Sequence, residues 1–203
     1  MKKHIAVLLA FVCLAGLFSS CTLTLRKEEP QTQPEGNLTS YGIDMDVNVT
    51  PSGTPKNEAL YAQKHPYIGR EPQELRRLLG EPAGLKDDGI AIQSVDEPYG
   101  ITLYYVCGAE DIERFQELPE RLISLQNNAL VILALIENCG YVQFALQTES
   151  TYWQRAKIST AKATVFRYDI AWADKAIGGD IKKVAETQAG FTEFYDKLAQ
   201  RGD

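Results

Sequence analysis

Few side chains of this sequence have the types and spacing that catalysis requires. Ser159 and Lys162 have the Ser-x-x-Lys spacing of penicillin-binding enzymes, in which the lysine lies one helical turn from a nucleophilic serine. The Lys-Thr-Gly and Ser-Asp-Asn elements of those enzymes are absent from the sequence. A cap at the start of a helix therefore explains Ser159 and Thr160 better.

The sequence also indicates no metal site and no cofactor. His65 is the only histidine beyond the first 20 residues, so one chain cannot form a histidine-based metal cluster. A Ser-His-Asp triad would need His65, yet the Gly-x-Ser-x-Gly turn that presents the serine is absent. Asp44, Asp46 and Asn48 imitate the start of a calcium loop, but Pro55 stands where the bidentate glutamate belongs.

Side chains beside predicted turns could contact a ligand or a partner. Asp96 and Glu97 could act as the acid and base of a hydrolase if their surroundings separated their pKa values, although a turn usually leaves its acids solvated. Tyrosines beside turns can present a ring and a hydroxyl to a partner, and the alternative is that they seal the edge of a sheet. The candidate ligand or partner surface consists of Tyr67, Arg70, Glu97, Tyr99 and Tyr104.

Two cysteines, Cys107 and Cys139, lie in the predicted folded part of the chain. Both border the same predicted core, and an exported protein can keep a disulfide, so the two could be bridged. The alternative, which we favour, is a pair of buried thiols that act as small apolar side chains.

The first 20 residues have the pattern of a secretory signal. Lys2 and Lys3 precede an apolar segment, residues 5–18, which is too short to span a bilayer as an ordinary helix. Small residues then precede Cys21, as in the bacterial lipobox, where the cysteine receives a diacylglycerol and becomes the mature N-terminus. We therefore expect lipid attachment at Cys21 and anchoring at the outer side of the cell membrane, with plain secretion or an uncleaved anchor as the alternatives.

The charge of the mature chain excludes one class of partner. Removing the first 20 residues takes away two lysines and no acid, so 27 acids face 19 lysines and arginines and the net charge is −8. Nucleic-acid binding needs clustered positive charge, so we expect no nucleic-acid partner.

Residues 21–56 are predicted to be a disordered tether. They are polar, contain few large apolar residues and include Pro30, Pro34, Pro51 and Pro55, so they cannot bury enough surface to order themselves. The remaining residues, 57–203, are enough for one domain with a modest core.

The central segment of this domain is residues 122–144, which contain the longest apolar run of the mature chain, residues 129–136. Apolar residues recur there at spacings of three and four, and Gly140 follows, so we predict a buried helix over residues 120–138 with a glycine stop. A buried strand over residues 129–136 is the alternative. The alternating residues Tyr141–Gln147 predict a half-buried strand.

The other elements follow from local patterns. We predict a short helical segment over residues 59–64, and a helix that begins near Pro72, buries leucines and ends at Gly80. The acidic residues 110–117 are predicted to form a helical turn or a loop. Residues 90–95 and 101–106 are predicted to form a hairpin. Thr160 could cap a helix that carries Phe166, Ile170, Ala173 and Ile177 on one stripe, and a last helix carries Phe191, Phe194, Tyr195 and Leu198. The predicted fold is α+β: a small antiparallel sheet of three to four strands, with a buried central helix and two C-terminal helices packed on it.

Several motifs in this domain carry a resemblance to a known family. They are Tyr61, residues 66–69, the leucine helix that ends at Gly80, residues 97–101 and residues 128–138. Together they resemble domain of unknown function 4825, which occurs in Gram-positive lipoproteins and in extracytoplasmic parts of membrane proteins, some of which also carry a metallopeptidase of the antibiotic-sensor type. The resemblance covers about residues 61–146, and Arg70 departs from it, because the family commonly has an acid after the glycine.

The resemblance implies an exported, lipid-anchored protein and supplies no reaction. We expect a non-enzymatic module that binds or senses something at the outer face of the cell membrane, with a membrane protein as a candidate partner. A carboxylate-dependent hydrolase and a purely structural envelope protein are the alternatives.

Overall fold

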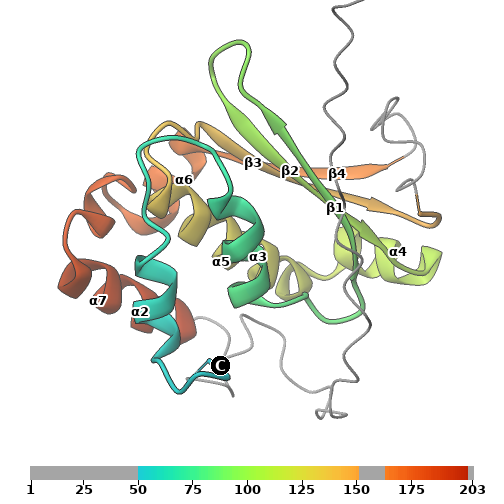
Figure 1. Ribbon diagram of the computed structural model, residues 1–203. Coiled ribbons are helices and arrows are strands. Elements are labelled where there is room, and N and C mark those ends of the chain that lie inside the picture. Colours follow the sequence, from blue (N-terminus) through green and yellow to red (C-terminus); the bar gives the residue numbers. More distant parts are fainter. Residues whose placement is uncertain (1–49, 151–162, 201–203) are drawn as a thin grey trace, which may run out of the picture. The chain divides into compact units, whose positions relative to one another are not determined.

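Four strands form one mixed sheet in the order β1-β2-β3-β4, as the computed structural model in Figure 1 shows. The structure describes residues 50–150 and 163–200. The strands are β1 (Lys86–Gln93), β2 (Gly100–Val106), β3 (Tyr141–Gln147) and β4 (Thr164–Asp169). The predictions of the signal segment, of lipid attachment at Cys21 and of a cap at Thr160, and most of the predicted tether, lie outside the described residues.

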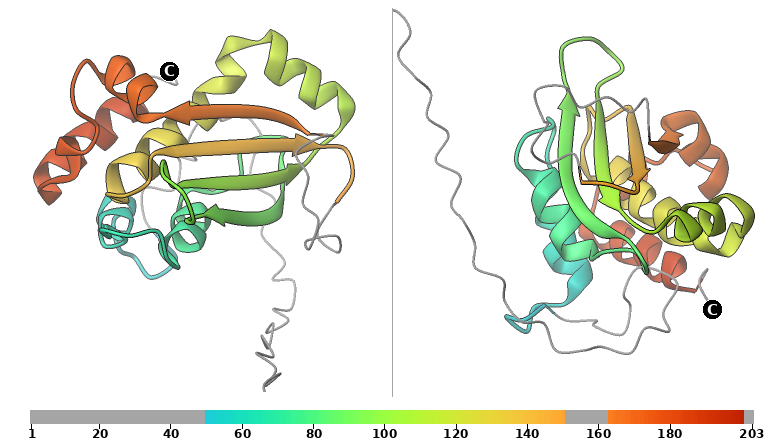
Figure 2. Two further views of the ribbon diagram at one scale, coloured as in Figure 1. Left: turned by 90° about the horizontal axis from the view of Figure 1, so that it is seen from above. Right: turned by 90° about the vertical axis from the view of Figure 1, so that its right-hand side faces the viewer.

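The helices gather on one face of this sheet (Figures 1 and 2). They are α2 (Lys56–Tyr61), α3 (Glu71–Leu79), α4 (Ala109–Glu117), α5 (Pro119–Leu135), α6 (Ile170–Ile177) and α7 (Gln188–Ala199), with a short 3-10 turn, η3 (Lys183–Ala185). The α+β class is confirmed, and so are the buried central helix and the two C-terminal helices. Among the described residues, no helix is both long and apolar enough to cross a membrane.

One detail of the predicted sheet is wrong. The pairs β1–β2 and β3–β4 are antiparallel, but β2 and β3 run parallel, with Gly100 opposite Tyr141 and Val106 opposite Gln147. Parallel strands need a long crossover, and α4 and α5 supply it between the two strands. The prediction treated the segment between the strands only as cover for the sheet, so it missed the crossover.

The central helix is confirmed, and the strand alternative for residues 129–136 is wrong. α5 ends at Leu135, three residues earlier than predicted, and Ile136 has an extended backbone that pairs with His65. Gly140 is not among the glycines with positive φ, so it is not the left-handed stop that we predicted. The pairing of Ile136 with a distant loop ends the helix, and no local pattern reports such a contact.

Another correction concerns residues 164–169. These residues form strand β4 instead of the start of a helix, and Phe166 lies opposite Phe144 of β3. The helix begins at Ile170, where the side chain of Asp169 accepts a hydrogen bond from the Trp172 amide over 2.8 Å. The spacing of four residues between Phe166 and Ile170 is a coincidence. Phe166 faces the core from a strand, and the helix happens to begin four residues later.

Most of the other local predictions are confirmed. In α3, Pro72 lies in the first turn, the leucines at 75, 78 and 79 are buried, and Gly80 ends the helix with a φ of 80°. β1 and β2 form the predicted hairpin, and Tyr141–Gln147 is a strand. The core between the sheet and α5 contains fully buried side chains of β2, β3 and α5, among them Leu103, Phe144, Leu130 and Leu133.

Candidate functional site

Three loops meet at the end of the sheet where the β1–β2 hairpin turns. They are residues 62–70, residues 94–99 and residues 136–140. The His65 amide donates to the carbonyl oxygen of Leu135 over 2.9 Å, and the Glu137 amide donates to the carbonyl oxygen of His65 over 3.0 Å. We call the surface formed by these three loops the hairpin end. Its loops contain the motif of residues 66–69 and parts of the motifs at residues 97–101 and 128–138.

Side-chain contacts hold the first and third loops together. The Ile68 amide donates to Oδ1 of Asn138 over 2.8 Å, and the Asn138 amide donates to the carbonyl oxygen of Pro66 over 3.2 Å. Both partners belong to motifs that are 70 residues apart in the chain. The motifs therefore specify contacts between loops as well as local turns.

Gly140 joins the third loop to the hairpin. Its amide donates to the carbonyl oxygen of Tyr99 over 2.8 Å. A Cβ atom at this position would lie 2.8 Å from Cβ of Pro98 and 3.3 Å from the carbonyl oxygen of Tyr99. Glycine is required here because the two backbones approach closely.

Lys182 stabilises the third loop of the hairpin end. Its Nζ donates to the carbonyl oxygens of Leu133, Ile136 and Cys139 over 2.6, 2.8 and 2.9 Å. These carbonyls lie at the C-terminal end of α5 and in the loop after it, where a cation is favoured by the helix dipole. Burial lowers the pKa of Lys182 to about 8. The sequence analysis missed this residue, because a lysine after Gly178 and Gly179 carries no local sign of such a role.

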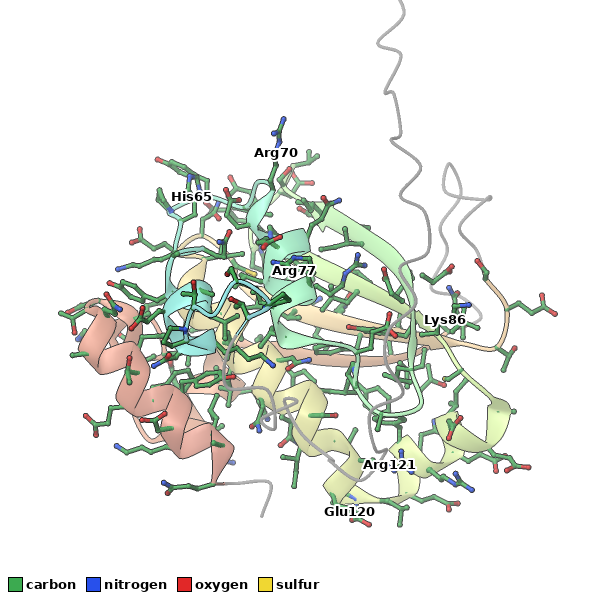
Figure 3. All side chains as sticks on the ribbon, turned by 60° about the horizontal axis from the view of Figure 1, so that its bottom comes forward. His65, Arg70, Arg77, Lys86, Glu120 and Arg121 are labelled. Carbon is green, nitrogen blue, oxygen red and sulfur yellow. The ribbon has the colours of Figure 1, made fainter. Side chains whose placement is uncertain are left out.

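Large exposed side chains lie at the hairpin end. Tyr67 is 66% exposed and Val95 is 86% exposed. Arg70 is exposed, and in Figure 3 its side chain points away from the ribbon. Tyr67 and Val95 are two of the five large apolar side chains that are exposed in the described residues.

Glu71 adds a carboxylate behind the first loop. Its side chain is 21% exposed, its Oε1 lies 4.0 Å from Nδ1 of His65, and its buried Oε2 has no hydrogen-bond partner. Nδ1 of His65 is in turn 2.8 Å from the carbonyl oxygen of Tyr67. Where the sequence departs from the family pattern at Arg70, an acid thus follows one residue later.

The structure brings together only part of the predicted partner surface. Tyr67, Arg70 and Glu97 are exposed in the loops of the hairpin end, and Tyr99 is half-buried there. Tyr104 is 6% exposed in the middle of β2, and burial, followed by the neighbouring Tyr141, raises its pKa. Tyr104 therefore does not belong to the hairpin end.

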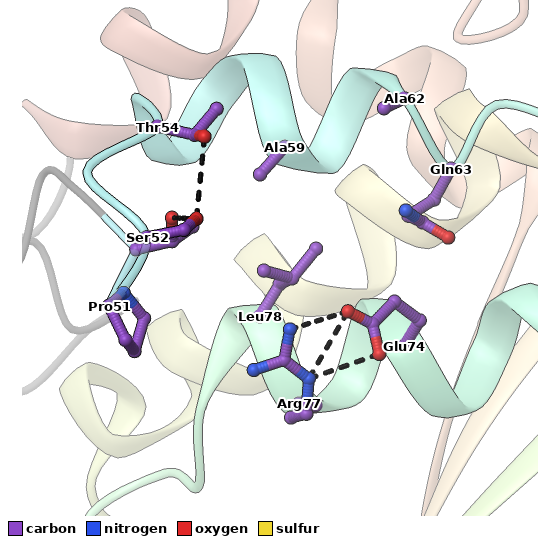
Figure 4. Close-up of a pocket in the computed structure, with 10 residues that line it drawn as sticks. Pro51, Ser52, Thr54, Ala59, Ala62, Gln63, Glu74, Arg77 and Leu78 are labelled. Carbon is purple, nitrogen blue, oxygen red and sulfur yellow. Dashed lines mark hydrogen bonds and ion pairs between the residues drawn. The ribbon is translucent and has the colours of Figure 1, made fainter.

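A groove lies elsewhere, between α2, α3 and residues 50–54 (Figure 4). It has a volume of about 400 Å³. Hydroxyl groups of Ser52 and Thr54 lie on one side, and the ion pair of Glu74 and Arg77 lies on the other. The hydrogen bond from Arg77 lowers the pKa of Glu74, so this acid is ionised and paired.

The acids proposed for a hydrolase lie outside this groove. Asp96 and Glu97 are exposed in the hairpin turn, and neither lines the groove of Figure 4 or the shallow depression on α7. In residues 50–150 and 163–200, no group of three or more His, Cys, Asp or Glu side chains could hold a metal ion.

Cys107 and Cys139 are free thiols, and the disulfide between them is not formed. Cys139 precedes β3, and Cys107 follows β2. Because β2 and β3 are parallel and in register, the two cysteines lie beyond opposite ends of a seven-residue strand pair, which is itself about 20 Å long. A disulfide needs Cα atoms within roughly 7 Å, so the sheet topology excludes it.

Both thiols are expected to resist iodoacetamide in the folded protein at about pH 8. Burial raises the pKa of each to about 11, and the thiolate is the reactive form. Mass spectrometry should find neither residue modified in buffer and both modified in denaturant without a reductant. Rapid modification of Cys139 in buffer, or a denatured protein that reacts only after reduction, would contradict this assignment.

The fold and the hairpin end together define a small α+β domain whose loops, far apart in the chain, build one exposed surface. The family model described as domain of unknown function (DUF4825) matches residues 60–160, and the chain belongs to this family. No curated protein and no solved structure matches the chain.

Proposed function

We propose that this chain is a lipid-anchored protein on the outer face of the cell membrane, and that it binds a membrane-protein partner through the hairpin end. The observation that carries the proposal is the convergence of the motif loops on one exposed surface. The loops are held together by five backbone and side-chain hydrogen bonds, donated by the amides of His65, Ile68, Glu137, Asn138 and Gly140.

The construction of this end supports binding. Tyr67 and Val95 expose apolar surface that gains free energy when a partner covers it, by about 25 cal/mol per Å². Arginine and tyrosine, the residue types of Arg70 and Tyr67, are enriched at the centres of protein interfaces. The Lys182 contacts and the close approach at Gly140 hold the loops before a partner arrives, which lowers the entropy cost of binding.

The kind of partner follows from the anchor. The signal pattern and Cys21 support attachment to the membrane by acyl chains, which confines the domain to a thin layer above the bilayer. Proteins in the same layer meet the domain at a high effective concentration. An integral membrane protein with an extracytoplasmic loop is therefore the partner that fits best.

The proposal is tested by photo-crosslinking of the full chain in its native cells. A benzophenone amino acid at Tyr67 is expected to give a discrete adduct in the membrane fraction. The matched control carries the same amino acid at Leu118, which is 40% exposed between α4 and α5, at the opposite end of the sheet. In the same cells, Cys21→Ser should release the chain from the membrane and abolish the adduct.

Three outcomes would overturn the proposal. They are equal adducts at positions 67 and 118, no adduct at either position, and an adduct that persists after Cys21→Ser has released the chain. The hydrolase stays a prediction, because Asp96 and Glu97 are both exposed and nothing in their positions favours catalysis. The structural envelope protein also stays a prediction.

A further inference from the structure

We propose that strand β1 pairs with β1 of a second copy of this chain, so that two sheets join edge to edge. The proposal concerns a surface other than Tyr67 and Arg70, and it goes beyond binding of the membrane-protein partner. It starts from the position of β1, which is the outermost strand on the side of the sheet opposite β4 (Figure 2, left).

The open edge of β1 has two different halves. In the first half, the Asp87 amide donates to Glu81 and the Gly89 amide donates to Asp87, and a bulge at Asp88 interrupts the regular pairing. In the second half, residues 90–92 pair with β2 on one side, and no described residue outside this ladder forms a hydrogen bond with their backbone. The first half is thus closed to another strand, and the second half offers free donors and acceptors.

The second half also lacks the features that usually protect a sheet edge. Residues 89–93, Gly-Ile-Ala-Ile-Gln, contain no charge and no proline. Ile92 is 42% exposed. Natural proteins commonly place lysine, proline or a bulge at such an edge, because an apolar edge pairs with other strands. The other edge, β4, carries Arg167 within the strand and ends at Asp169.

The sequence of this half is complementary to itself. In an antiparallel pair centred on Ala91, Ile90 of one copy faces Ile92 of the other, and Gly89 faces Gln93. The same alignment brings Lys86 of one copy to the end where Asp96 of the other lies, so opposite charges meet. An arrangement of this kind is two-fold symmetric and closes after two copies.

The isoleucines also lie on the correct face. Ile90 is paired with Leu103 and Ile92 with Ile101 across the β1–β2 ladder, and both partners are buried in the core beneath the sheet. Ile90 and Ile92 therefore point towards the helices, and Ile92 is exposed only because no strand lies beyond it. A second β1 would cover Ile92 with Ile90 of the other copy and extend both cores.

The test uses the full chain with Ala91→Cys, expressed in cells and treated with a mild oxidant. Position 91 faces its own counterpart, so a disulfide-linked dimer is expected on a non-reducing gel. Its band should be at least several-fold stronger than the dimer band of the wild-type chain. The matched control is Val165→Cys, which places an exposed cysteine on the edge strand β4 and should give no excess of dimer.

Two further arms test the register and the contact. Chains with Ile90→Cys and chains with Ile92→Cys should crosslink when expressed together and should not crosslink when expressed alone. Ile92→Lys added to Ala91→Cys should abolish the dimer, because a lysine would face an isoleucine of the other copy, while circular dichroism verifies that the fold is kept.

The dimer experiments test this proposal independently of the photo-crosslinking experiment at Tyr67. Ala91→Cys that forms no more dimer than Val165→Cys would overturn it. So would a crosslinked species that contains a different protein in place of the dimer, and so would a dimer that survives Ile92→Lys.

Discussion

Replacing Phe144 with alanine is expected to lower the free energy of unfolding by about 4 kcal/mol, which is typical of phenylalanine-to-alanine changes in a core. Phe144 is 0% exposed in β3, and Leu103 and Phe166 lie opposite it on the two neighbouring strands. Its ring lies 6.4 Å from the ring of Tyr105 and 6.0 Å from that of Tyr168. The change would leave a cavity that these large side chains cannot fill.

Urea denaturation followed by circular dichroism measures this effect. Val165→Ala is the matched control, because Val165 is in the adjacent strand and 37% exposed, and we expect a change of about 0.5 kcal/mol or less. A loss below about 1.5 kcal/mol for Phe144→Ala would show that the core can close around the missing ring, contrary to the packing described here.

Replacing Lys182 with methionine is expected to cost about 3 kcal/mol, since each buried polar group left without a partner costs roughly 1–3 kcal/mol. The carbonyl oxygens of Leu133 and Cys139 would lose the donor that Lys182 supplies, and both residues are buried. Methionine keeps the apolar stem, so the loss is assigned to the amine. Removal of a partly buried charge offsets part of the cost.

Lys183→Met is the control for this change. Lys183 is adjacent, its side chain is 72% exposed, and it pairs only with Asp180 at 3.7 Å, so its loss should cost less than about 0.5 kcal/mol. Equal stability of the two variants would refute the supporting role of Lys182. Because Lys182 supports the loops, its replacement should also weaken the adduct at Tyr67.

The pH dependence gives a second measure of Lys182. Burial lowers its pKa from 10.5 to about 8 in the folded chain, whereas Glu137, Asp174 and Asp180 act in the opposite direction. Between these two values the unfolded chain binds more protons, so the free energy of unfolding rises with pH. The stability difference between the wild type and Lys182→Met should therefore widen from about pH 8 to about pH 10.5. A constant difference would contradict the lowered pKa.

Local patterns predicted the elements whose stability depends on neighbours in the chain. Pro72 and Gly80 bound α3 because proline suits the first turn and glycine accepts a positive φ, and both effects are local. The alternation in Tyr141–Gln147 predicted β3 for the same reason. Phe166 misled the prediction because helical and strand spacings coincide over a few residues, and only pairing with Phe144 separates them.

The sequence by itself determined the α+β class, the buried helix α5, the family and the expectation of an anchor at Cys21, because each of these is read from local patterns, singly or as a set of short motifs. The tertiary structure decided the parallel pairing of β2 and β3, the separation of the two cysteines and the role of Lys182. It also assembled the hairpin end from loops that are distant in the chain. Contacts of this kind depend on how elements are stacked in space, and no local spacing encodes them.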